Sequence, residues 1–191
     1  MVCFLQNKPN RRYREMKKVL VLITAVIGAV LLAACGGGSG KTQTIVFQGI
    51  TMEIPANWKL EESTADEDYA IYEKSGSKSH EYKLLLTNTF GLMDDGSYDL
   101  ERAGEFFKEV TDDDASFSDP SDPVAGTFAG KYDMHTIECH YNMHSVTQGE
   151  ISFPCKRIRI YMGDHDVVMQ FSTAEGDFEA FDAAVAGATC E

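Results

Sequence analysis

Apolar and polar positions alternate with a two-residue period soon after residue 40. Ile50, Met52 and Ile54 are apolar, and the residues between them are polar. Such alternation is typical of a β-strand that buries one face, and strands of this kind mostly pair antiparallel. Similar patterns predict strands over residues 45–47, 50–54, 69–73 and 82–90. Trp58 follows the second strand, and we expect its ring to pack over the sheet end.

A second group of strands lies between residues 137 and 172. The odd positions from Ile137 to Met143 are apolar, and residues 147–150 have the composition of a hairpin turn. In the return strand the apolar positions are odd up to Cys155 and even from Ile158 onwards. This change of phase near Pro154 predicts a β-bulge or a break. A last strand is expected over residues 167–172.

Apolar residues at helical spacing predict two helices. Asp99 should cap the first, which is expected to end near residues 112–114 because acidic side chains are unfavourable at a helix C-terminus. Asp177 should cap the second, which carries Phe178, Phe181, Val185 and Ala188 on one stripe. Residues 116–130 predict a long loop with room for one short strand. The order of elements indicates an α+β sandwich, a mainly antiparallel sheet covered by two helices.

The beginning of the chain has the pattern of an export signal. Met16, Lys17 and Lys18 precede an uncharged run over residues 19–34, which is rich in Val, Leu, Ile and Ala. The run has 16 residues, fewer than the roughly 20 that a membrane-spanning helix needs. We therefore interpret residues 16–34 as a signal peptide and residues 1–15 as an upstream extension, with translation starting at Met16.

The residues at the end of this signal resemble the bacterial lipobox. Leu32, Ala33 and Ala34 precede Cys35, and the resemblance implies cleavage before Cys35 and attachment of diacylglycerol to its sulfur. Two acyl chains give stable anchoring, so we expect a lipoprotein on the extracytoplasmic face of a cell membrane. Residues 35–40 then form a lipidated Gly/Ser tether. Residues 41–191, which number 151, are expected to form a single domain.

Charge narrows the range of partners. After Cys35 the chain has 11 basic and 29 acidic residues, a net charge of −18. A surface of this sign repels phosphate backbones, so we expect no nucleic-acid partner. The expected partners are the membrane, through the lipid, and a protein at the cell surface.

Three cysteines remain beyond Cys35, an odd number for an exported protein. Cys139 and Cys155 lie at equal distances from residue 147 in the predicted turn, so they should face each other on the apolar face. We predict a disulfide between them. Cys190 could instead pair with either one, or all three could be buried thiols.

The weak candidates for a metal site are His140, His144 and His165. Four strand residues span about 13 Å, so His140 and His144 are too far apart to share one ion. His140 could join His165 or an acidic side chain of a neighbouring strand, but solvated histidines are the simpler interpretation. Cys139 and His140 are adjacent and therefore point to opposite faces of the strand, which excludes a nucleophile and base pair. We identify no catalytic residues and expect no cofactor.

The layout resembles the PsbP-like fold, which includes an extrinsic photosystem II protein and a yeast Ran-binding protein. The resemblance rests on residues 49–58, an early strand that ends in Pro-x-x-Trp, and on the closing helix around Phe178 and Phe181. It covers nearly all of residues 41–191 and implies a non-enzymatic adaptor or assembly role. The leading hypothesis is a non-catalytic binding or assembly module. The alternatives are capture of a small ligand or metal in a cleft between sheet and helix, and a hydrolase.

Overall fold

The computed structural model describes residues 41–64, 68–77 and 82–191. The predicted signal peptide, the lipobox with Cys35 and the tether lie outside these residues. Neither helix of the described part is long and apolar enough to cross a membrane.

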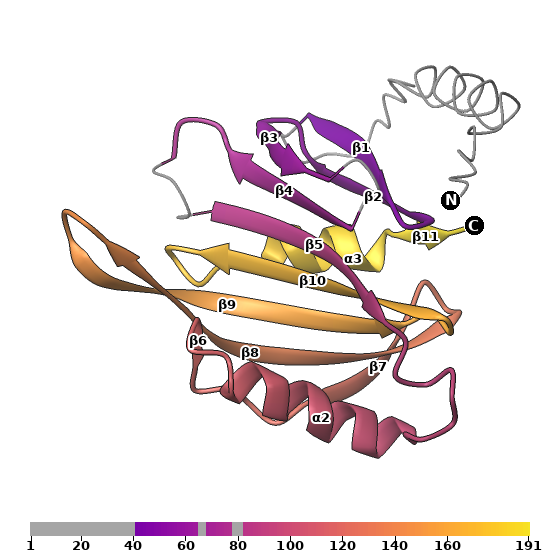
Figure 1. Cartoon of the computed structure of the whole chain (residues 1–191). Helices are drawn as coiled ribbons and strands as arrows, with labels where there is room; N and C mark the ends of the chain where they lie inside the picture. Colours follow the sequence, from indigo (N-terminus) through magenta and orange to yellow (C-terminus); the bar gives the residue numbers. More distant parts are fainter. Residues whose placement is uncertain (1–40, 65–67, 78–81) are drawn as a thin grey trace, which may run out of the picture. The chain divides into compact units, whose positions relative to one another are not determined.

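One eight-stranded sheet is the largest element of the described chain (Figure 1). Its order is β3-β4-β5-β10-β9-β8-β6, with β7 also paired to β8, and every pairing is antiparallel. The bounds are β3 (Trp58–Ser63), β4 (Tyr69–Lys74), β5 (Tyr82–Phe90), β6 (Phe117–Ser118), β7 (Val124–Phe128), β8 (Tyr132–Ser145), β9 (Gly149–Tyr161) and β10 (His165–Thr173).

A small three-stranded sheet lies beside it. The strands β1 (Thr42–Phe47) and β2 (Ile50–Pro55) form a hairpin, and β11 (Thr189–Cys190) pairs with the other edge of β2. Gln48 and Gly49 connect the hairpin with positive φ angles of 49° and 74°, as a two-residue primed turn requires. The sequence pattern did not predict β3 or β11.

The two helices start and end close to where capping chemistry places them. In α2 (Leu100–Asp112), the Asp99 carboxylate accepts a hydrogen bond of 2.8 Å from the Arg102 backbone N–H, which confirms the predicted cap. α3 (Glu179–Ala186) begins after Phe178, one residue later than expected. The Asp177 carboxylate still accepts the Glu179 N–H at 2.9 Å.

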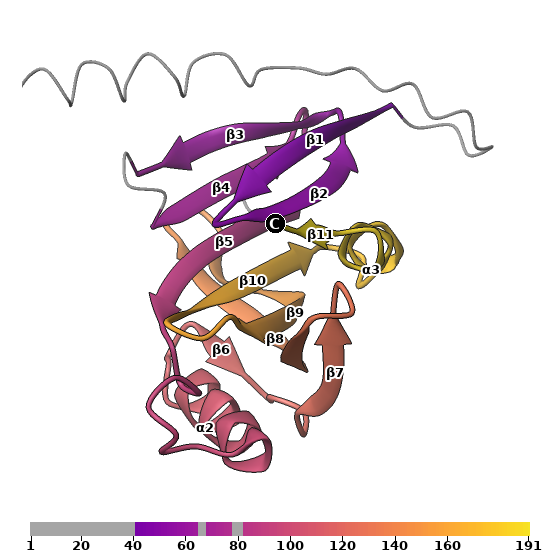
Figure 2. The ribbon, with the colours of Figure 1, turned by 90° about the vertical axis from the view of Figure 1, so that its right-hand side faces the viewer.

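The eight-stranded sheet has two different faces because side chains alternate along each strand. On one face, Leu86, Met169 and Ile158 are neighbours across β5, β10 and β9. Their side chains are buried in the main core, to which β1, β2 and α3 also contribute. The next pair of cross-strand neighbours, Gln170 and Arg157, points to the opposite face, which α2 covers. Figure 2 shows α2 and α3 well separated on the two sides of the sheet. The predicted α+β class with a mainly antiparallel sheet is confirmed, although the sheet dominates and each helix covers only part of one face.

The predicted bulge near Pro154 is wrong. The β8–β9 register runs unbroken from the Ser145–Gly149 pair to the Met134–Ile160 pair. The apolar positions change phase because different elements cover the two faces of β9. The face of the strand that must be apolar therefore changes along its length, although the strand itself stays regular. A register shift occurs instead between Leu60 and Glu62 in β3.

Candidate functional site

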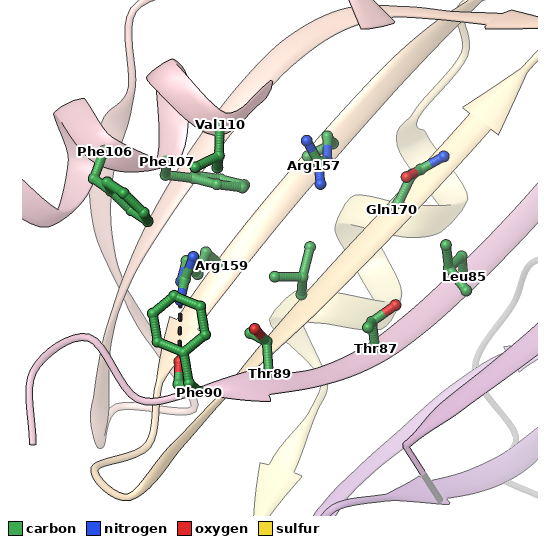
Figure 3. A pocket seen from close by; sticks show the side chains of 11 residues that line it. Leu85, Thr87, Thr89, Phe90, Phe106, Phe107, Val110, Arg157, Arg159 and Gln170 are labelled. Carbon is green, nitrogen blue, oxygen red and sulfur yellow. Dashed lines mark hydrogen bonds between the residues drawn. The ribbon is translucent and has the colours of Figure 1, made fainter. Parts of the chain in front are cut away.

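A pocket lies between α2 and the face of the sheet that points away from the main core (Figure 3). Its volume is about 300 Å³. The helix contributes Phe106, Phe107 and Val110, whose spacing places them on the side of α2 that faces the sheet. The sheet contributes the floor from β5, β10 and β9: Leu85, Thr87, Thr89, Phe90, Val168, Gln170, Arg157 and Arg159.

Strand register brings the polar residues of the floor together. Gln170 of β10 lies opposite Arg157 of β9, and Arg159 lies opposite Val168 in the next row on the same face. Two arginines separated by one residue therefore point to the same side of β9. Both guanidinium groups lie beneath α2, within a domain whose overall charge is strongly negative.

Arg159 has its charge compensated. Its Nε donates to Asp166 Oδ2 at 2.8 Å, and its Nη2 donates to the Phe90 carbonyl oxygen at 3.1 Å. Asp166 is fully buried and also accepts the Leu92 backbone N–H at 3.2 Å. Burial raises the pKa of this carboxyl, and the Arg159 guanidinium opposes the rise. These contacts hold the β5–α2 connection to the sheet, so we assign Arg159 a structural role.

Arg157 has no such compensation. Its Nη1 donates to the Thr111 hydroxyl at 2.7 Å, and its guanidinium lies 4.2 Å from the Phe117 ring centre and 5.4 Å from that of Phe107. Its Nε is buried without a hydrogen-bond partner, and no carboxylate of the described chain forms an ion pair with it. Burial lowers the pKa of Arg157, with Cys139, Cys155 and Asp114 acting in the opposite direction. A guanidinium nevertheless stays protonated, so the pocket holds an uncompensated positive charge.

The rest of the lining suits a small bound group. Gln170 is 4 % exposed, and its amide makes no hydrogen bond with another described residue. The Thr87 and Thr89 hydroxyls also face the pocket (Figure 3). The helix supplies apolar walls, and a mostly apolar hollow with a few converging polar groups is the usual form of a ligand site. Within the described lining no nucleophile has a base beside it.

Cys139 and Cys155 are direct cross-strand partners, as the position of the predicted turn indicated. Both are buried with Phe117 against Tyr141. All three cysteines of the described chain are free in the structure. Interaction between the two adjacent side chains raises the pKa of Cys155, which burial raises further, and lowers the pKa of Cys139. Cys190 packs against the main core instead and does not belong to the cluster that contains Cys139 and Cys155.

The three histidines considered as metal ligands are not brought together. His140 is exposed and lies 3.8 Å from Asp119, His144 is exposed opposite Glu150, and His165 bonds to the neighbouring Asp164. The described residues contain no group of three or more His, Cys, Asp or Glu side chains placed to hold a metal ion.

The pocket residues Arg157, Arg159 and Gln170 were missed by sequence reasoning. A usable signal was present, because an arginine-x-arginine pair alternates with Ile158 and Ile160 inside a strand. Charged residues on one face and aliphatic residues on the other, in a strand too central to be exposed, indicate a polar buried face.

A second hollow, of about 800 Å³, lies between β7, β8 and α3. Its only lysine, Lys156, is neutralised by Asp182 at 2.8 Å and Glu138 at 3.5 Å. This hollow is more open and has no uncompensated charge in its described lining, so the α2 pocket is the stronger candidate.

No protein-family model matches the sequence, and no curated protein matches it. The fold is similar to that of solved structures. Cyanobacterial PsbP (CyanoP) from Synechocystis is 15 % identical, with a TM-score of 0.53 over 84 % of this chain and 99 % of CyanoP. The Ran-binding protein Mog1p from Saccharomyces cerevisiae is 12 % identical, with a TM-score of 0.54 over 80 % of this chain and 96 % of Mog1p. The domain that follows residue 40 therefore has the PsbP-like fold that the sequence predicted.

Proposed function

We propose that this chain is a lipid-anchored, non-catalytic binding or assembly module on the extracytoplasmic face of a bacterial membrane, and that it holds a protein partner at the α2 pocket. The observation that carries the proposal is Arg157, a charged group set into a pocket with an unpartnered Nε. Burying a charge without a counter-charge is costly, and a partner that supplies the missing contacts would recover part of that cost.

The fold and the sequence add support. Mog1p, which has a similar fold, is a Ran-binding protein, so this architecture can present a protein-binding surface. The lipobox resemblance at Cys35 would tether the domain by a short Gly/Ser segment, which suits a partner at or near the same membrane. Phe90 is 63 % exposed at the pocket rim, where an apolar ring can take part in an interface.

A second candidate is capture of a free small molecule. The observation in its favour is the pocket itself, because about 300 Å³ is at the lower end of the range for ligand sites. The cleft also lies between a helix and a sheet, as that hypothesis expects.

In-cell photocrosslinking tests the proposed function. A benzophenone amino acid replaces Phe106 at the pocket rim or, as a control, Leu60, which is 52 % exposed on the distant edge strand β3. We expect a specific protein adduct from position 106 and not from position 60. Adducts from both positions alike, or only with lipoprotein-processing enzymes, would contradict a protein-binding role of the pocket. A small molecule retained in native mass spectra, and lost in Val110→Trp, would instead support the second candidate.

A further inference from the structure

The geometry points to the chemistry of the pocket's ligand: a carboxylate attached to a flat apolar group, with Arg157 and Gln170 as the residues that recognise it. This inference rests on the proposed function, since it assumes that the α2 pocket is the binding site. The carboxylate could belong to a free small molecule or to an acidic side chain of a protein. The two sources share the same recognition chemistry.

The hydrogen-bond donors of Arg157 indicate which acceptor group the ligand carries. Arg157 uses Nη1 for Thr111, whereas Nε and Nη2 donate to no described residue. These two nitrogens form one edge of the guanidinium plane, and two parallel donors at this spacing match the two oxygens of a carboxylate. A bound carboxylate would accept from Nη2 and, after a small shift of the guanidinium, from buried Nε. The amide of Gln170, opposite Arg157 in the register, can donate a further hydrogen bond.

The net charge of the pocket lining indicates the charge of the ligand. Arg159 is already paired with Asp166, so the pocket has one uncompensated cation rather than two. One negative charge balances it. A dianionic phosphate would bring more charge than the pocket neutralises, in a domain of net charge −18 and with Asp114 near Arg157. A monovalent carboxylate is therefore favoured over phosphate or sulfate.

The apolar walls of the pocket indicate the shape of the rest of the ligand. Phe106, Phe107 and Val110 lie on the helix side of the pocket, and Leu85 forms part of its floor (Figure 3). Val168 also lines the pocket. A small hydrophilic acid would leave these walls without contacts. An aromatic or similarly flat body beside the carboxylate would fill the space between helix and sheet and bury apolar surface.

Benzoate and its neutral isostere benzamide test the inference on the full chain purified in non-ionic detergent. Calorimetry measures affinity, and the side-chain Nε–H signal of Arg157 in nitrogen-15 NMR reports the contact. We expect benzoate to shift this signal and to bind about tenfold or more tightly than benzamide, since a charge-assisted contact contributes about 1.5–3 kcal/mol. In Arg157→Gln the preference for benzoate should disappear.

Two variants separate recognition from folding. Val110→Trp keeps Arg157 but fills the pocket, so it should bind neither probe. Arg102→Gln removes the same charge from the outer surface of α2, where Arg102 pairs with Glu105, and should bind benzoate like the original chain. Equal affinity for benzoate and benzamide, or benzoate binding that survives Val110→Trp, would overturn the inference.

A pair of short peptides distinguishes the two sources. Acetyl-Phe-Glu-Phe-amide has a side-chain carboxylate as its only charge, and acetyl-Phe-Gln-Phe-amide has none. Preference for the glutamate peptide over benzoate assigns a protein acid, and the reverse assigns a small molecule. If no probe binds the pocket while the crosslinker at position 106 still captures a protein, the inference fails and the proposed function stands. If benzoate binds and no protein is captured, the protein-binding function fails and the inference stands.

Discussion

His135 shows how a polar residue is accommodated on the α2 face. It is 4 % exposed, shares a hydrogen bond of 2.9 Å with the Tyr161 hydroxyl through Nδ1, and packs against Gly104 of α2. A β-carbon at position 104 would lie 2.7 Å from His135 Nε2, so the glycine is required for this close approach of helix and strand. Burial lowers the pKa of His135 below its ordinary value of 6.5.

This pKa makes the stability of the domain dependent on pH. The unfolded chain takes up a proton at His135 near pH 6.5, but the folded chain resists it until lower pH. The free energy of unfolding should therefore fall as the pH drops below about 6.5, by up to about 1.4 kcal/mol per pH unit from this residue. In His135→Gln, urea unfolding at pH 7.5 and 5.5 should show a smaller difference between the two values.

His144→Gln provides the matched control, because His144 is exposed. It should keep the pH dependence of the original chain. Equal pH dependence in His135→Gln and His144→Gln would contradict a destabilising role for protonated His135.

At the scale of elements, simple periodicity predicted those strands and helices that bury one side. The alternation of β2 and the cap at Asp99 depend on local chemistry and are visible in the sequence. β11 has only two residues and exists because β2 offers a free edge, which no local pattern reveals. β9 was found, but its two-sided burial was mistaken for a bulge, and the arginines of its second face were overlooked for the same reason. The candidate pocket could not be predicted, since it depends on which strands become neighbours.

The β8–β9 hairpin carries the two cysteines of the predicted disulfide. Cys139 and Cys155 are register partners, so we expect them to link under oxidising conditions while Cys190 stays free. A cross-link that closes a loop of about 15 residues stabilises a protein by about 3 kcal/mol in the chain-entropy model. Peptide mapping without reductant should recover the linked pair, and reduction should lower the unfolding midpoint.

Single substitutions separate this pair from its rivals. Cys190→Ser should leave the effect of reductant unchanged, whereas Cys155→Ser should abolish it. Recovery of Cys190 in a cross-linked peptide would refute the proposed connectivity.

At the scale of the whole molecule, the predicted anchor decides where the domain acts. If Cys35 receives diacylglycerol, the chain should incorporate radiolabelled palmitate in a bacterial host and partition into detergent. Cys35→Ala should lose the label and appear in the soluble fraction or the precursor form, whereas Cys190→Ser should behave like the original chain. A Cys35→Ala protein that remains as firmly attached and labelled would exclude lipidation at this residue.

Side chains alternate along β9, so one face of the strand packs in the core and the other face lines the pocket. Many small domains must combine these two roles in one core. Ile158 and Ile160 belong to the packing that keeps the two sheets together, whereas Arg157 and its row belong to the pocket. Libraries varied at Leu85, Val168 and Gln170 should therefore yield new ligand preferences while the thermal midpoint changes little. A lineage with this architecture would be able to diversify the ligand preference of the pocket on one face of the sheet, without changing the core on the other face.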